Sequence, residues 1–142
     1  MLNINFFKQF VKFALVGALN TGVDFLVLNI EMLITGITSG PLMFVQNIIS
    51  FSIATTNSYF LNKHWTFRDK SKSQEGFKFA QFLTISVIGA LINSAIVYSA
   101  TTFLDPMFNL SPTLWANLTK LLATGISLIW NFLGYKFIVF KK

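Results

Sequence analysis

Hydrophobic residues along this chain fall into two long stretches, each interrupted once by turn-forming residues. Residues 13–62 contain two charged side chains, and Gly, Ser, Thr and Pro break the pattern at 35–41. Residues 79–135 also contain two charged side chains, and Asp and Pro break the pattern at 105–112. Each resulting run is close to the roughly 20 residues that cross a hydrocarbon core of about 30 Å. The pattern predicts four transmembrane helices, near residues 10–34, 42–62, 79–103 and 113–135.

The composition excludes an ordinary soluble enzyme. Of the 142 residues, 54% are hydrophobic and 11% are charged, whereas a soluble domain carries roughly a quarter of charged residues. The net charge of +6 would favour nucleic acid as a partner in a polar protein, but here it follows the ends of the apolar runs, so no nucleic-acid partner is expected. There is no cysteine, which excludes disulfides and thiolate chemistry.

The basic residues predict the orientation of the helices. Ten of the eleven lie before the first run, between the second and third runs, or at the C-terminus, and the segments 35–41 and 104–112 have none. Under the positive-inside rule, both termini and the middle segment are cytoplasmic. We therefore expect a multi-pass protein of the cytoplasmic membrane. Aromatic residues beside these basic residues suit an interfacial belt: Trp65, Phe67, Tyr135, Phe137 and Phe140.

The two halves of the chain resemble each other. Matches occur at an offset of 72 residues in the first and third runs, and at 73 in the second and fourth. Chance similarity remains an alternative, because membrane helices share small and apolar residues. We predict an all-α membrane protein whose four helices form two parallel helical-hairpin repeats, about 9–68 and 79–141. The matched pairs include Gly17 with Gly89, Ala18 with Ala90, Lys63 with Lys136, and Phe67 with Phe140.

Polar residues form one stripe on each predicted helix. On the fourth helix, five polar residues are spaced three or four positions apart, so all of them lie on a single face. Lipid cannot solvate such a face. The stripes are therefore predicted to converge on the interior of a bundle or on a groove, where they would bind substrate. The predicted binding residues are Asn20, Asp24, Asn47, Asn93, Asn117, Lys120, Thr124, Ser127 and Asn131.

Asp24 and Lys120 are predicted to lie at one depth. At about 1.5 Å per residue, each is roughly 21–23 Å from the cytoplasmic edge, and Asn47 and Asn93 share that level. Two interpretations stay open. The charges form a structural ion pair that offsets their burial, or they mark the path of a substrate or ion.

Catalytic patterns are missing from the sequence. It has no Ser/His/Asp set, no paired carboxylates, no phosphate loop and no metal-ligand spacing. Its one histidine, His64, lies in the basic segment without nearby acids, which favours an interfacial role over metal binding. We expect no enzyme activity, no metal and no cofactor.

Two motifs resemble the GtrA-like family of small four-helix membrane proteins. The first is Phe-Val-Lys-Phe-Ala-Leu-Val-Gly at 10–17 with Asn20-Thr21 and Asp24-Phe25, and the second is Asn-Ser-Tyr-Phe-Leu-Asn-Lys-His-Trp-Thr-Phe at 57–67. Asn131-Phe132 with Lys136 echoes the second motif. Gly134-Tyr135 and Ile138 depart from it, which puts equal roles for the two repeats in doubt.

The resemblance implies a role in glycosylation of cell-surface polysaccharide or teichoic acid. Members are proposed to move a polyprenyl-phosphate-linked sugar, typically glucose, across the cytoplasmic membrane. The cytoplasmic cations Lys63, Arg68 and Lys136 would attract the lipid phosphate. A second reading is a non-transporting subunit that docks a membrane glycosyltransferase, and a third is a cation-coupled exporter, which the intramembrane Lys120 argues against. Membrane lipid is the expected environment, and a homo-oligomer is compatible with four short spans.

Overall fold

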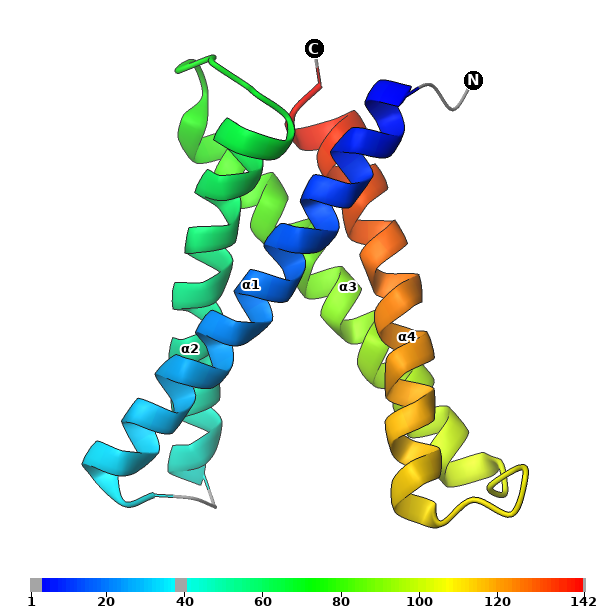
Figure 1. Cartoon of the computed structure of the whole chain (residues 1–142). Helices are drawn as coiled ribbons and strands as arrows, with labels where there is room; N and C mark the ends of the chain where they lie inside the picture. The colour runs from blue at the N-terminus through cyan, green and yellow to red at the C-terminus, as the bar shows by residue number, and fades with distance from the viewer. Residues whose placement is uncertain (1–3, 38–40, 142) are drawn as a thin grey trace. The chain divides into compact units, whose positions relative to one another are not determined.

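The structure is a computed structural model that describes residues 4–37 and 41–141 (Figure 1). Within these ranges some helical side chains are not described, and only their place on the helix is used below. They are Met43, Phe44, Asn47, Ile48, Ser94, Val97, Tyr98, Thr101, Pro112, Thr113, Ala116 and Lys120.

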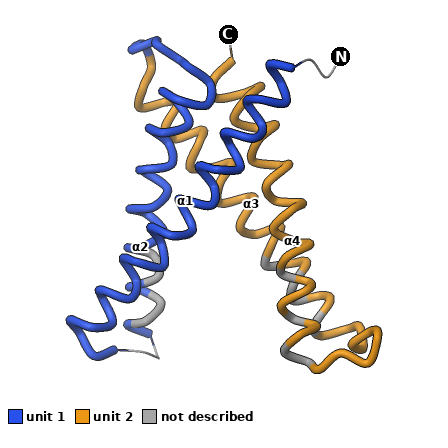
Figure 2. The backbone as a smooth tube through the Cα atoms, viewed as in Figure 1, with its two compact units in different colours: residues 1–73, 142 blue, residues 74–141 orange. Residues whose placement is uncertain are grey.

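The described part of the chain contains four long α-helices and two short π-helices, and it contains no strand. The chain divides into two compact units, residues 1–73 and residues 74–141 (Figure 2). Each unit is a helical hairpin whose second helix ends in a π-helical turn. The elements are α1 (Ile4–Thr35), α2 (Pro41–Leu61), η1 (Asn62–Thr66), α3 (Glu75–Phe103), α4 (Pro112–Gly134) and η2 (Tyr135–Val139).

In unit 1, residues 1–73, α1 packs against α2 and η1. Phe13 and Val16 are buried on α1, and Ala54 and Tyr59 are buried on α2. Most other large apolar side chains of α1 are exposed, and Leu33 is exposed to 84%. An apolar exterior around a small buried seam is what a helix needs when lipid covers its outer face.

In unit 2, residues 74–141, α3 packs against α4 and η2. Phe82 and Ile85 of α3 and Phe132 of α4 are buried between the helices of this unit. Ser111 caps the N-terminus of α4, because its side chain accepts a hydrogen bond from Leu114 N–H at 3.2 Å. The proline that follows this cap has no N–H that would need a partner in the first turn.

The π-helical turns are equivalent in the two units. Phe67 N–H donates to the Asn62 carbonyl at 2.9 Å, and Phe140 N–H donates to the Tyr135 carbonyl at 2.8 Å. Both bonds span five residues, and the two turns are 73 residues apart in the chain. Their first side chains, Asn62 and Tyr135, are both buried although they differ in chemistry.

Two helices begin earlier than the apolar pattern predicts. α1 begins at Ile4 rather than near residue 10, and α3 begins at Glu75 rather than near residue 79. The prediction counted only apolar residues, whereas a helix continues into the interfacial region as long as its backbone is hydrogen-bonded. Glu75 in the first turn of α3 also interacts favourably with the helix dipole. The remaining helix ends lie within one residue of the predicted positions.

Three described stretches are long and apolar enough to cross a membrane: Ile4–Thr35, Glu75–Asn93 and Asn117–Val139. α2, with 21 residues, is the antiparallel partner of α1 in unit 1 and is also about 30 Å long. The fold is therefore that of a multi-pass, all-α membrane protein, as the sequence predicts.

Candidate functional site

Part of the polar stripe of α4 contacts α3 inside unit 2. Asn93 Nδ2 donates a hydrogen bond to Thr124 Oγ1 at 3.2 Å. Ser127 Oγ donates to the Thr124 carbonyl at 3.1 Å. The structure thus brings three predicted site residues together, and it gives each a partner within the hairpin. A polar bond between helices in lipid stabilises their packing by about 0.6–2 kcal/mol.

Asn131 marks a close approach between the same two helices. A Cβ atom at Gly89 would collide with Asn131 Oδ1, so a larger residue at this position requires the amide to shift. Asn131 Oδ1 is itself buried and has no hydrogen-bond partner among the described residues. This acceptor is therefore enclosed between α3 and α4.

Three aromatic side chains extend this polar seam through contacts that the sequence pattern does not predict. The Tyr135 hydroxyl lies 2.6 Å from Ser86 Oγ. The indole N–H of Trp130 donates to the Ile85 carbonyl, and that of Trp115 donates to the Ala100 carbonyl, each at 3.1 Å. The two indole N–H groups bond to helix carbonyls, and the spacing of side chains in the sequence does not reveal such acceptors.

The predicted interfacial aromatic belt is only partly correct. Trp65 and Phe137 are exposed, but Phe67, Tyr135 and Phe140 are buried. Tyr135 stacks on Phe82 with ring centroids 4.0 Å apart. The π-helical turns change the face that successive residues occupy, so aromatic side chains expected at the surface point into each hairpin.

In unit 1 the polar residues of α1 have fewer partners. Asn20 and Asp24 lie one turn apart on α1 and are both partly exposed. The Oδ1 atom of Asn20 is buried and has no hydrogen-bond partner among the described residues. The Oε2 atom of Glu31, near the end of α1, is also buried and has no hydrogen-bond partner among the described residues.

The proposed pairing of Asp24 with Lys120 stays a prediction. Asp24 belongs to unit 1 and Lys120 to unit 2, and the Lys120 side chain lies outside the described part of the structure. The Asn47 side chain on α2 also lies outside the described part of the structure. Asn117 is exposed near the N-terminal end of α4.

The three predicted phosphate-attracting cations differ in their surroundings. Lys63 in η1 is only 2% exposed, and its carbonyl accepts a hydrogen bond from Asp69 N–H at 2.8 Å. Lys136 in η2 is partly exposed, and Arg68 is exposed just after η1. Arg68 is therefore the one of the three best placed to meet a ligand from solvent or lipid.

A basic pocket of about 410 Å³ lies in unit 1 between the N-terminal turns of α1 and the end of η1. In the sequence, Lys8 and Lys12 indicate only the orientation of the helices. Their spacing of four residues on one helix face is the signal that could have identified them as a pair. The pocket is lined by Asn5, Lys8, Gln9, Lys12, Thr66, Phe67 and Arg68.

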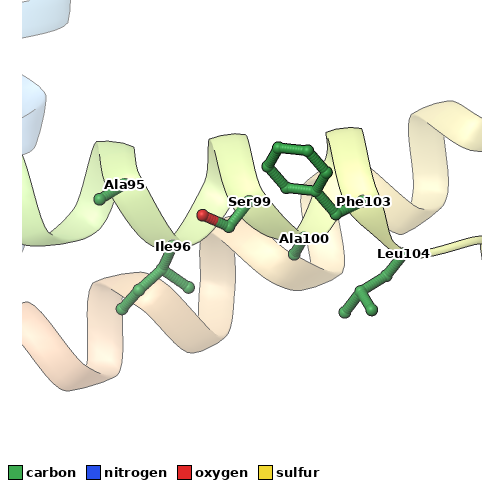
Figure 3. A pocket seen from close by; sticks show the side chains of 6 residues that line it. All are labelled: Ala95, Ile96, Ser99, Ala100, Phe103 and Leu104. Carbon is green, nitrogen blue, oxygen red and sulfur yellow. The ribbon is translucent and has the colours of Figure 1, made fainter.

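A second pocket, of about 480 Å³, lies along the C-terminal half of α3 (Figure 3). Its side chains are apolar except for the Ser99 hydroxyl, and Ala95 and Ala100 leave room beside Phe103. It offers no charge to a ligand. Among the described residues, no group of three His, Cys, Asp or Glu side chains could hold a metal ion.

Helical hairpins with apolar outer faces, a polar seam and basic residues at their π-helical turns define a class of small, multi-pass, all-α membrane proteins. The family model described as "GtrA/DPMS, transmembrane domain" matches residues 12–140. The chain belongs to this family, which confirms the resemblance carried by its motifs. Comparisons with curated proteins and with solved structures gave no match.

Proposed function

We propose that the protein translocates a polyprenyl-phosphate-linked monosaccharide, typically glucose, across the cytoplasmic membrane. The sugar would then be used to glycosylate a cell-surface polysaccharide or teichoic acid. Membership of the GtrA/DPMS transmembrane domain family makes this a membrane protein linked to glycosylation. The proposed translocation and the proposed substrate rest on the polar residues of its helices.

The observation that carries the proposal is a pair of amide oxygens inside helices that are long enough to span a membrane. Asn20 Oδ1 on α1 and Asn131 Oδ1 on α4 are buried without a partner among the described residues. An unpaired buried acceptor costs about 1–3 kcal/mol. Sugar hydroxyl groups are donors that would remove this cost, whereas lipid tails would not.

In this mechanism the head group follows the polar residues while the prenyl tail stays in the bilayer. The exposed apolar side chains of α1 and α4 suit contact with that tail. Lys120 supplies the cation that meets the phosphate, and Asp24 balances the charge of Lys120 when substrate is absent. Both termini are cytoplasmic, so substrate enters from the side that carries Arg68.

The direct test is translocation by purified protein in liposomes, using a fluorescent short-chain polyprenyl-phosphate glucose. Transfer above that in protein-free vesicles is expected for the wild-type chain. Lys120→Gln and Asn20→Ala are expected to abolish or strongly slow transfer. Lys70→Gln is the matched control, because Lys70 is exposed outside the helices and its loss should leave the rate unchanged. Equal rates in all three variants would exclude the proposed path.

A second candidate function is a non-transporting subunit that docks a polyprenyl-phosphate glycosyltransferase. Trp65 favours it, because this aromatic side chain is 44% exposed beside the basic segment. Large aromatic and arginine side chains dominate many protein interfaces. Co-purification of a glycosyltransferase with the wild-type chain, and its loss in Trp65→Ala, would support this function. Phe67 and Lys63 are unsuitable for that test, because both are buried and their replacement would disturb the fold.

A further inference from the structure

The basic pocket of unit 1 brings three cations from two separated segments together. Lys8 and Lys12 come from α1, and Arg68 follows η1. None of the described residues that line the pocket is acidic. We propose that this pocket binds the phosphate group of a membrane lipid, and that within the proposed function it is where the polyprenyl phosphate first docks.

Charge and hydrogen bonding both favour phosphate. Ammonium and guanidinium groups form their strongest hydrogen bonds with phosphate and carboxylate oxygens. The side-chain amides of Asn5 and Gln9 also line the pocket and provide further N–H donors. A volume of about 410 Å³ accommodates a phosphate together with part of an attached group.

An unpartnered hydroxyl gives independent support. Thr66 lines the pocket and is 2% exposed, and its Oγ1 atom has no hydrogen-bond partner among the described residues. Threonine hydroxyls in a helix commonly bond the carbonyl four residues earlier, and in this protein Thr21, Thr56 and Thr84 do so. Thr66 is left with a donor that a phosphate oxygen would accept.

Lys12 is held beside the pocket by the ring and the carbonyl of Trp65. Lys12 Nζ lies 5.2 Å from the centre of the Trp65 ring and 3.5 Å from the Trp65 carbonyl. Arg68 has a left-handed backbone with φ of 51°, which a non-glycine residue adopts at a cost of about 1–2 kcal/mol. This conformation carries the chain away from η1 at the point where the guanidinium reaches the pocket.

The neighbouring surface favours a lipid over free phosphate. Phe7 and Val11 on α1 are exposed beside Lys8 and Lys12. A phosphate attached to a hydrocarbon chain would satisfy the cations and cover these apolar side chains together. Inorganic phosphate would gain only the polar contacts.

Binding can be measured without translocation, using protein in a maltoside detergent that contains no phosphate. The probe is a short-chain polyprenyl monophosphate, followed by native mass spectrometry and by tryptophan fluorescence. Saturable binding is expected, at least about tenfold tighter than for inorganic phosphate. Trp65→Phe should remove the fluorescence change but keep binding by mass. Absence of saturable binding, or equal affinity for inorganic phosphate, would overturn the lipid-phosphate assignment.

Two substitutions address the cations directly. Lys8→Gln with Arg68→Asn removes two pocket charges, and asparagine tolerates the left-handed backbone at residue 68. Affinity should fall by about tenfold or more. Lys70→Gln with Lys72→Gln removes two exposed charges outside the pocket and should change affinity by less than about twofold. Equal losses in the two double variants would show general charge attraction and overturn the site.

Thr66→Val tests the hydroxyl. Valine fits this position of the turn, because Val139 occupies the equivalent position of η2 and is equally buried. A loss of affinity of several-fold with unchanged folding is expected, and unchanged affinity would remove Thr66 from the site. Lys120→Gln should retain phosphate binding while translocation stops. Translocation retained in pocket variants that have lost binding would reject this inference and leave the proposed function intact. Binding without translocation by the wild-type chain would reject the proposed function alone.

Discussion

Tyr135 and Ser86 join the two helices of unit 2 through a single pair of hydroxyl groups. Ser86 Oγ donates its proton to the Phe82 carbonyl at 2.8 Å. Because serine has one hydroxyl proton, the Tyr135 hydroxyl is the donor in the 2.6 Å contact between the two side chains. The first residue of η2 is thereby fixed to the middle of α3, and the ring of Tyr135 stacks on Phe82.

Removing this hydroxyl should weaken unit 2 by a small, measurable amount. Tyr135→Phe keeps the stacked ring and loses one hydrogen bond, so we expect a loss of about 0.5–1.5 kcal/mol in the free energy of unfolding. Tyr135→Ala also loses the ring contact and should cost about 3–5 kcal/mol. Denaturant titration in detergent measures both. In a double-mutant cycle with Ser86→Ala, additive effects would contradict a direct bond.

Gly89 should tolerate no side chain. Gly89→Ala places a methyl group against the Asn131 amide, and we expect a loss of about 1–3 kcal/mol from overpacking. Gly125→Ala is the matched control in α4, because nothing lies within 4 Å of a Cβ at that position. It should be neutral or stabilising by up to about 1 kcal/mol.

The collision between a side chain at residue 89 and the Asn131 amide can also be relieved by a substitution at Asn131. Combining Gly89→Ala with Asn131→Ala removes the obstructing amide and should recover a large part of the lost stability. Failure of this rescue, or equal losses in Gly89→Ala and Gly125→Ala, would show that the close approach of α3 and α4 is not what requires glycine.

The sequence predicts the helices well because their signal is spread over many residues. Runs of apolar side chains locate the ends of α1 to α4 within one residue, except the starts of α1 and α3, and Thr124 of the polar stripe meets α3 through Asn93. The side chains whose burial differs from the prediction lie at the π-helical turns. One extra residue per turn rotates the following side chains by about 100°, which is why Lys63 is buried although its charge suggested a surface position.

The candidate site is harder to predict than the fold. The basic pocket joins residues more than fifty positions apart, and Lys12 meets Trp65 only because α1 packs beside η1. Whether a polar atom has a hydrogen-bond partner also depends on neighbouring residues that the spacing of polar positions in the sequence does not specify. Asn93 has a partner in Thr124, whereas Asn20 Oδ1 has none among the described residues.

Labelling of single cysteines should establish the orientation, because the chain has no native cysteine. Ser73 lies in the exposed segment before α3, and Asn109 lies in the exposed segment between α3 and α4. With cytoplasmic termini, a membrane-impermeant maleimide added to intact cells should label Asn109→Cys alone. Both should react after the cells are opened. Labelling of Ser73→Cys in intact cells would reverse the proposed orientation.

Thr35 should be important for the end of the first hairpin. Its hydroxyl accepts from Gln46 Nε2 at 2.6 Å and from Ile37 N–H at 3.2 Å, and it donates to the Glu31 carbonyl at 2.8 Å. Thr35→Val preserves the shape of the side chain and removes all three bonds. Gln46 is 6% exposed and its Oε1 atom already lacks a partner among the described residues, so the whole amide would become unpaired. We expect a loss of about 1–3 kcal/mol in unfolding free energy.

Thr56→Val provides the matched control for this substitution. Thr56 is exposed, and its hydroxyl bonds only the Ser52 carbonyl of its own helix, so its replacement should change stability by less than about 0.5 kcal/mol. Denaturant midpoints of the two variants in the same detergent give the comparison. Because the Gln46 amide has lost its partner in Thr35→Val, adding Gln46→Leu should recover stability in that background. A double variant no more stable than Thr35→Val would show that Gln46 does not depend on Thr35, and the bond between α1 and α2 would not hold the hairpin together.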